Sequence, residues 1–319
     1  MSGKRTSVGD FLFNTGTGFF ALVLVLLVAA IGVVLCIQSM PTIREFGLNF
    51  WRTQVWNPVS GEFGALPFIW GTLYSSLLAI LIAAPISIGV AVFISELCPN
   101  SLKQPLVFLT ELLATVPSIV YGLWGVFVLV PAVRAVQMWV PEWMRAIPLF
   151  SGPRNGVSML SASLILTIMV IPFTSSVARE VLKAVPMAQR ETAYALGATR
   201  WEVTRVALHY ARVGIVGAIM LGLGRAFGET MAVTMVIGNN PKMSLSLFAP
   251  QYTMAAVIAN EFTEAANDLH ISALIEIGLV LFIVTFAINV ASRLLIWGMT
   301  HQKKQKVAVP VKVVAEQAS

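Results

Sequence analysis

Two charged residues lie within an apolar segment of the sequence. Arg225 and Glu229 belong to the segment GLGRAFGETMAVTMVIGN, residues 222–239. If this segment is helical, a spacing of four places both side chains on one face. An Arg at the centre of a bilayer costs about 2.5–3.5 kcal/mol on insertion scales, so an intramembrane charge is a functional candidate by default.

The pair has two interpretations, which are compatible with each other. A guanidinium group offers planar, paired donors that match phosphate oxygens, so Arg225 would serve as a transient anchor for an oxyanion. Glu229 would then offset its charge in the empty site, and Thr230 is a neighbouring polar candidate. Alternatively, the two side chains form a self-satisfied ion pair that fixes helix packing. The glycines Gly224 and Gly228 favour close packing of this helix against another.

A second polar string, PSIVYG at residues 117–122, falls within another apolar segment. Pro117 removes a helical hydrogen bond and predicts a kink. Ser118 and Tyr121 would line a polar path or, equally, make interhelix hydrogen bonds. Two further acids, Glu111 and Glu276, are expected to reach the membrane surface or to pair with a neighbouring subunit.

The charged stretch that begins near Lys183 is predicted to form two short helices around a turn. Pro186 can open the first helix, and Gly197 allows the turn. Thr199 followed by Glu202 is a capping-box pattern for the second helix. The stretch would be ordered and present three large side chains among charges: Tyr194, Leu196 and Trp201. It suits docking on a partner, although an amphipathic helix on the lipid surface has the same composition.

Composition indicates the elements that must position these residues. Of 319 residues, 57% are hydrophobic and 11% charged, against roughly 25% charged in soluble domains. No alternating strand pattern is present, so we expect an all-α bundle of six spans. The predicted spans are 19–37, 68–95, 105–131, 157–177, 212–238 and 271–297.

The same pattern divides the chain and orients it. We expect an N-terminal segment (1–18), a permease domain (19–297) with a coupling loop at about 179–211, and a disordered tail (298–319). Lys and Arg gather in the termini and that loop, so the positive-inside rule places all three in the cytoplasm. Residues 38–66 and 239–270 would form outer segments.

Several kinds of site have no support in the sequence. The GxxxxGK[ST] phosphate-binding loop and zinc or haem spacings are missing, so any ATP hydrolysis requires a partner chain. No basic stripe interleaved with aromatics favours nucleic acid. An acidic group in the last outer segment fits a solvated or docking surface better than a metal site: Glu261, Glu264, Asp268 and His270.

The loop near Lys183 resembles the EAA loop of ATP-binding-cassette importer permeases. The shared string is Glu191-Thr192-Ala193, followed by Gly197-Ala198. The resemblance implies a coupling helix that docks in a groove on the ATPase, with the contact made around Glu191, Ala193, Gly197 and Ala198. The Leu-Pro that this family carries about a dozen residues later is missing, and residues 208–210 are LHY.

Four longer strings resemble the phosphate-specific importer permeases and cover roughly residues 40–297. They are GLGRAFGETMAV, VPSIVYGLWG, FGLNFWRTQVW and NEFTEAANDLHISAL. The third string and the long outer segment favour the C-type half over its A-type paralogue. The resemblance implies a type I, MetI-like bundle in the bacterial inner membrane that carries inorganic phosphate and catalyses no bond chemistry itself.

The same resemblance implies a complex. Its partners would be a paralogous A-type permease, two copies of a cytoplasmic ATPase with ATP and Mg, and a periplasmic phosphate-binding protein. No cofactor is expected in this chain. Three rivals stay open: a permease half for sulfate or molybdate, an ion-coupled carrier with Arg225 and Glu229 as a proton relay, and a membrane scaffold.

Overall fold

The computed structural model describes residues 8–304. This part of the chain contains helices and no β-strand. Six helical segments are long and apolar enough to cross a membrane, which confirms the predicted fold class. They are Leu12–Gln38, Leu66–Leu97, Ser118–Trp139, Met159–Lys183, Arg200–Phe227 and Asp268–Met299.

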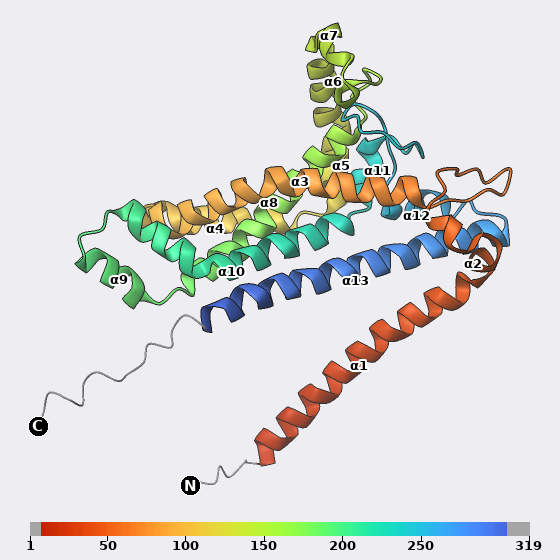
Figure 1. Ribbon diagram of the computed structural model, residues 1–319. Coiled ribbons are helices and arrows are strands. Elements are labelled where there is room, and N and C mark those ends of the chain that lie inside the picture. The colour runs from red at the N-terminus through yellow and green to blue at the C-terminus, as the bar shows by residue number, and fades with distance from the viewer. Residues whose placement is uncertain (1–7, 305–319) are drawn as a thin grey trace, which may run out of the picture.

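Figure 1 shows how the helices are arranged. In chain order they are α1 (Val8–Gln38), α2 (Met40–Phe46), α3 (Leu66–Val92), α4 (Asn100–Thr115), α5 (Ser118–Trp124), α6 (Val130–Trp139), α7 (Glu142–Arg145), α8 (Met159–Lys183), α9 (Met187–Ala195), α10 (Arg200–Phe227), α11 (Met231–Ile237), α12 (Met254–Glu261) and α13 (Asp268–Lys304). Two π-helical turns, Phe93–Leu97 and Gly125–Leu129, extend α3 and join α5 to α6. Two 3-10 turns, Gly47–Trp51 and Pro148–Phe150, lie in connections.

The centre of the bundle is the packing of α3 against α8, its most extensive helix pair. Small buried residues recur at every fourth position of α3 and allow the two helices to approach closely. These residues are Ser75, Ala79, Ala83, Ser87 and Ala91. Thr167 of α8 donates to the Ala79 carbonyl at 3.3 Å. The pair therefore forms a rigid frame to which the other helices attach.

The buried core has three parts along this frame. The middle part joins α3 and α8 to α11 around Ile165 and Val236. A second part, around Leu182 and Ala207, lies beside α9. The third contains Phe50 and Phe68 and packs α12 and the start of α13 at the opposite end, beside α2. Helix α9, the first residues of α1 and the last of α13 lie toward one end of the molecule (Figure 1).

The third span differs from the prediction of 105–131. Helix α4 ends at Thr115, and the chain is extended at Val116 and Pro117, whose ψ angles are 128° and 140°. A proline disfavours the helical region for the residue before it and cannot donate the next helical hydrogen bond. Pro117 therefore ends the helix rather than kinking it, and the span runs from Ser118 to Trp139.

The fifth span also differs from the prediction of 212–238. Helix α10 ends at Phe227, and α11 begins at Met231 as a separate short helix. The chain then turns back through Gly238, whose φ is +97°, and returns to the buried helix α12. Residues 239–270, which were expected to form an outer loop, include core residues because this hairpin fills the space beside α3 and α13.

The first and last helices are longer than the sequence predicted. Helix α1 begins at Val8, and α13 continues to Lys304, so residues 298–304 are helical rather than part of a disordered tail. The remainder of the predicted tail, and the N-terminal charges Lys4 and Arg5, lie outside the described residues.

Candidate functional site

Two helix breaks come together because α5 packs directly on α11. Glycines on α5 permit this approach. A Cβ atom on Gly122 would lie 3.1 Å from the Cα atom of Ala232, and one on Gly125 would lie 2.9 Å from a methyl group of Val236. The break between α4 and α5 and the break between α10 and α11 therefore belong to one region, although 110 or so residues separate them in the sequence.

Arg225 lies in the last turn of α10, at the edge of this region. Its side chain is half-buried, and its Cζ atom lies 5.3 Å above the centre of the Phe173 ring. Arg225 takes part in none of the ion pairs that the described residues form. Its buried Nε atom has no hydrogen-bond partner there. The guanidinium thus retains donors that an anion could use.

Glu229 is not positioned as the sequence predicted. Because α10 ends at Phe227, Glu229 lies in the break rather than on the helical face that carries Arg225, and no ion pair joins them. Its Oε1 atom accepts a hydrogen bond from the Ala232 backbone N–H at 3.3 Å. The predicted self-satisfied ion pair is therefore wrong, and Glu229 instead stabilises the start of α11.

Thr230 and Tyr121 both satisfy backbone groups at the breaks. Thr230 precedes α11, and its hydroxyl donates to the Gly228 carbonyl at 3.3 Å. The Tyr121 hydroxyl donates to the Leu113 carbonyl at 2.8 Å. That carbonyl would bond the N–H of residue 117 in a continuous helix, and a proline has no N–H. The interhelix bond considered for Tyr121 is therefore present.

The remaining predicted path residue, Ser118, opens α5 and is half-buried beside the same break. The five residues predicted to line a path thus lie at or beside the two breaks. Ser118 and Tyr121 belong to α5, Arg225 belongs to the end of α10, and Glu229 and Thr230 lie between α10 and α11.

The charged loop has the predicted local structure. Pro186 directly precedes α9, and Gly197 follows it with a φ of +83°. Both halves of the capping box are present: Glu202 accepts from the Thr199 backbone N–H at 2.7 Å, and the Thr199 hydroxyl accepts from the Glu202 N–H. Three large side chains on the loop are exposed: Tyr194 (51%), Leu196 (84%) and Trp201 (63%).

The four predicted coupling residues differ in exposure. Glu191 and Gly197 are exposed, whereas Ala193 and Ala198 are half-buried. Glu191 lies on the side of α9 that borders a cleft of about 370 Å³ between this helix and the adjacent ends of α3 and α4. The cleft is lined by Ser95, Glu96, Lys103, Lys183, Met187, Arg190, Glu191 and Tyr194.

The acidic residues near α12 form a structural contact. Glu261 accepts from the Trp56 indole N–H at 2.9 Å and lies 3.3 Å from the Nε2 atom of His270. Glu264 and Asp268 are exposed. The described residues contain no group of three side chains suited to a metal ion. Glu261 therefore helps to hold the segment before α3 against α12 and α13.

Glu111 and Glu276 were expected to reach the membrane surface or to pair with a neighbouring subunit, but the structure gives both a place within the chain. Glu111 pairs with Arg179 of α8 at 2.8 Å. Glu276 is 1% exposed, so its side chain is buried against other parts of the chain. Arg179 lies 68 positions from Glu111, a separation that hydropathy does not address.

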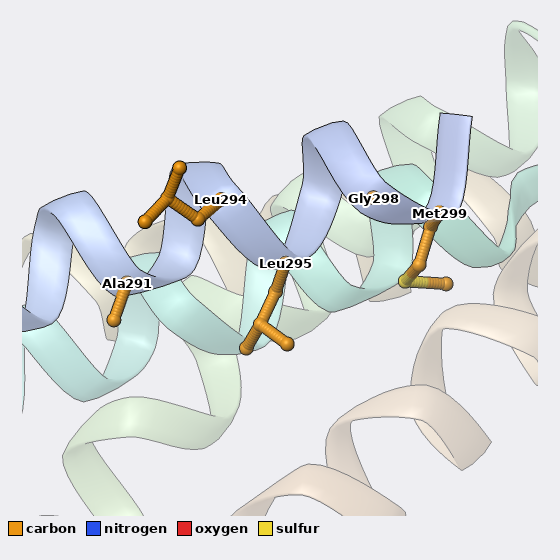
Figure 2. A pocket seen from close by; sticks show the side chains of 5 residues that line it. All are labelled: Ala291, Leu294, Leu295, Gly298 and Met299. Carbon is orange, nitrogen blue, oxygen red and sulfur yellow. The ribbon is translucent and has the colours of Figure 1, made fainter. Parts of the chain in front are cut away.

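A pocket on the last part of α13 is an unsuitable anion site. Figure 2 shows Ala291, Leu295 and Met299 on one side of the helix, with Leu294 directed to the other. These residues and Gly298 line the pocket, and none of their side chains can donate a hydrogen bond. The polar groups of the two helix breaks are better suited to an anion.

Comparisons with known proteins agree on the family. The sequence model described as "Binding-protein-dependent transport system inner membrane component" matches residues 97–299. A phosphate transport system permease protein PstC of Mesorhizobium japonicum is 46% identical over 296 residues, covering 91% of this chain and 90% of that protein. A probable PstC protein of Methanocaldococcus jannaschii is 39% identical over 260 residues, covering 79% and 82%.

The chain belongs to the PstC family of permease proteins. It is therefore an integral inner-membrane protein and a transport subunit rather than an enzyme in itself. The fold is also similar to that of a chain from the inward-facing MetNI methionine ABC transporter. The TM-score is 0.55 at 17% identity, covering 72% of this chain and 94% of that one. This likeness confirms the predicted MetI-like bundle.

Two arginines that sequence analysis did not single out form ion pairs in this structure. Arg179 is almost completely buried and pairs with Glu111 and Glu180. Arg190 of α9 pairs with Glu96 at 2.8 Å, and both side chains are nearly buried. A signal for Arg179 was present, because a lone Arg near the end of an apolar span needs a partner. Nothing local indicated Glu96 as the partner of Arg190.

Proposed function

We propose that this chain is one permease half of an ATP-driven importer of inorganic phosphate. The observation that carries the proposal is the half-buried guanidinium of Arg225, which lies beside two helix breaks in a permease fold. It forms no ion pair among the described residues, and its Nε atom has no hydrogen-bond partner there. Relatives named phosphate transport permeases support phosphate as the substrate.

In this proposal Arg225 is a weak, transient anchor for phosphate. Its planar donors match two phosphate oxygens, and Phe173 limits the movement of the guanidinium. Ser118, Tyr121 and Thr230 lie around the breaks as the polar lining. Glu229 is fixed at the start of α11 instead of being paired with Arg225, so it would disfavour prolonged residence of an anion nearby.

Coupling would take place through α9. The exposed Leu196 and Trp201 beside the EAA string offer an apolar contact for a cytoplasmic ATPase, which would bind ATP and Mg. Glu191, Ala193, Gly197 and Ala198 are proposed to shape this contact. The full complex would contain a paralogous A-type permease, two ATPase copies and a periplasmic phosphate-binding protein.

We infer the orientation of the chain in the membrane from charge and shape. Helix α9 and the described ends of α1 and α13 lie toward one end of the molecule (Figure 1), which we assign to the cytoplasm with both termini. The binding protein would dock at the end that carries α2 and α12. ATP binding would then move α9 and open the permease outward, and hydrolysis would reset it.

Uptake competition in cells separates this function from its rivals. Labelled phosphate uptake should persist in excess sulfate or molybdate and fall in excess unlabelled phosphate. It should also persist when the proton gradient is collapsed with ATP maintained. Inhibition by sulfate would assign a different oxyanion, and loss with the gradient would favour an ion-coupled carrier.

A second experiment tests the docking site. Glu191→Lys or Gly197→Asp should abolish copurification of the ATPase or uncouple its hydrolysis from uptake. Gly197 needs its positive φ, which an Asp adopts with strain, and Glu191 would exchange its charge beside Lys103 and Lys183. Wild-type copurification and coupling in both variants would contradict the assigned role of the loop.

A further inference from the structure

Arg190 joins three elements with one side chain. Its Nη1 atom donates to the Val185 carbonyl at 2.8 Å, and its Nη2 atom donates to the Leu182 carbonyl at 2.9 Å. Nη2 also donates to Glu96 Oε1 at 2.8 Å. Leu182 lies in the last turn of α8, and Glu96 lies in the π-helical turn that extends α3. The guanidinium thus ties α9 to the ends of two spans.

These bonds attach α9 to the ends of α3 and α8, whereas its other neighbour, α10, follows it directly in the chain. Helix α9 has no buried residue of its own, and its two ends are the turns at Pro186 and Gly197. By contrast, the side chains of Arg190 and Glu96 are only 12% and 11% exposed. Buried, charge-assisted hydrogen bonds are shorter and stronger than neutral ones, so they resist displacement of α9 relative to α3 and α8.

A second buried arginine continues the connection toward the proposed path. Arg179 lies about one turn before Leu182 on α8 and pairs with Glu111 of α4 at 2.8 Å. Helix α4 ends directly before Pro117, and Tyr121 of α5 bonds back to it through the Leu113 carbonyl. Polar contacts therefore join α9 to α8, α8 to α4 and α4 to α5, and the helices α8 and α4 connect these contacts to one another.

We propose that Arg190 is a positioning residue for energy coupling: by bonding Glu96, Leu182 and Val185, it makes α9 move as one body with the ends of α3 and α8. The proposal rests on the proposed function, because it assumes that an ATPase moves α9. The two proposals differ, because this one concerns how movement of α9 is passed on within the permease, whereas the proposed function concerns how the ATPase docks on α9.

The test uses the assembled complex with its paralogue, ATPase and binding protein. The contacts of Arg190 with Glu96, Leu182 and Val185 are called the clamp below. Arg190→Ala and Glu96→Ala each break it, and Glu96→Ala does so without altering α9. Each complex should retain ATPase copurification and hydrolysis, while phosphate transported per ATP falls by a factor of about 2 to 30. Arg293→Ala, an exposed arginine on α13, is the matched control and should keep the wild-type ratio.

The conservative variant supplies a readout that simple loss of stability would not give. Arg190→Lys keeps a positive charge beside Glu96 but replaces the planar fork of donors by a single ammonium, so its ratio should lie between those of wild type and Arg190→Ala. An unchanged ratio in Glu96→Ala would overturn the proposal, even if Arg190→Ala failed to assemble. A ratio in Arg190→Lys no better than that in Arg190→Ala would also overturn it.

The proposed function can fail separately. If the wild-type complex transports phosphate without ATP or does not bind an ATPase, the function is wrong before any variant is compared. If wild-type transport requires ATP but the clamp variants transport as much phosphate per ATP as wild type, the proposed function stands and the role assigned to Arg190 is wrong.

Discussion

Replacement of Arg225 by Ala should greatly reduce phosphate uptake and leave the chain folded. Arg225 makes no ion pair among the described residues, and its Nε atom is unpaired, so the folded state loses little when the side chain is removed. The contact with the Phe173 ring contributes about 0.5–2 kcal/mol, which bounds the expected destabilisation.

The effect on transport should be larger than this stability change. A hydrogen bond to a charged group contributes about 1.5–3 kcal/mol, and 1.4 kcal/mol corresponds to a tenfold change. Loss of one such bond to phosphate at the rate-determining position predicts roughly a 10- to 100-fold fall in uptake. Arg225→Lys keeps the charge but loses the planar pair of donors, so its uptake should lie between wild type and Arg225→Ala.

The assay compares labelled phosphate uptake with the amount of assembled complex in the membrane. Arg179→Ala is the contrasting variant, because Arg179 is buried and bonds Glu111 at 2.8 Å and Glu180 at 3.0 Å. It should reduce assembly and thermal stability first. The account of Arg225 is refuted if Arg225→Ala assembles normally and its uptake stays within twofold of wild type.

Two further predictions concern the structure around the site. Gly71→Ala should lower the free energy of unfolding by about 1–3 kcal/mol in a thermal melt, because the new Cβ atom would overlap the Tyr252 carbonyl. Gly89→Ala on the same helix meets nothing within 4 Å and should not destabilise. Tyr121→Phe should cost about 1–3 kcal/mol by leaving the Leu113 carbonyl unpaired, and this cost should shrink in a Pro117→Ala background, where the restored N–H can bond that carbonyl. Equal costs in both backgrounds would contradict this explanation.

Hydropathy and local chemistry were sufficient to predict the number of membrane spans and the structure of the charged loop. Six apolar segments predict six spans, because each must satisfy its backbone within a helix. Capping chemistry is also local, so the box at Thr199 and Glu202 and the turn at Gly197 could be predicted from residues three or fewer positions apart.

The sequence predictions were wrong where contacts between distant parts of the chain decide where a helix ends. The spacing of Arg225 and Glu229 suggested one helical face, but α10 ends at Phe227 because α11 turns away to pack on α5. That packing depends on Gly122, about a hundred residues earlier. A periodic pattern describes one helix and contains no information about such a partner.

Ion pairs between distant residues were missed for the same reason. Arg179 and Glu111 are 68 positions apart, and Arg190 and Glu96 are 94 apart. The residue types alone suggested a basic loop and a lone membrane acid. Only the fold shows that these charges pair with one another, and that Arg225 forms no ion pair among the described residues.

The most direct test of the account is labelled phosphate uptake into proteoliposomes. These would contain this chain with its paralogue and ATPase, the binding protein outside and ATP inside. The account predicts uptake that requires both ATP and the binding protein. Uptake at the same rate without ATP would contradict it.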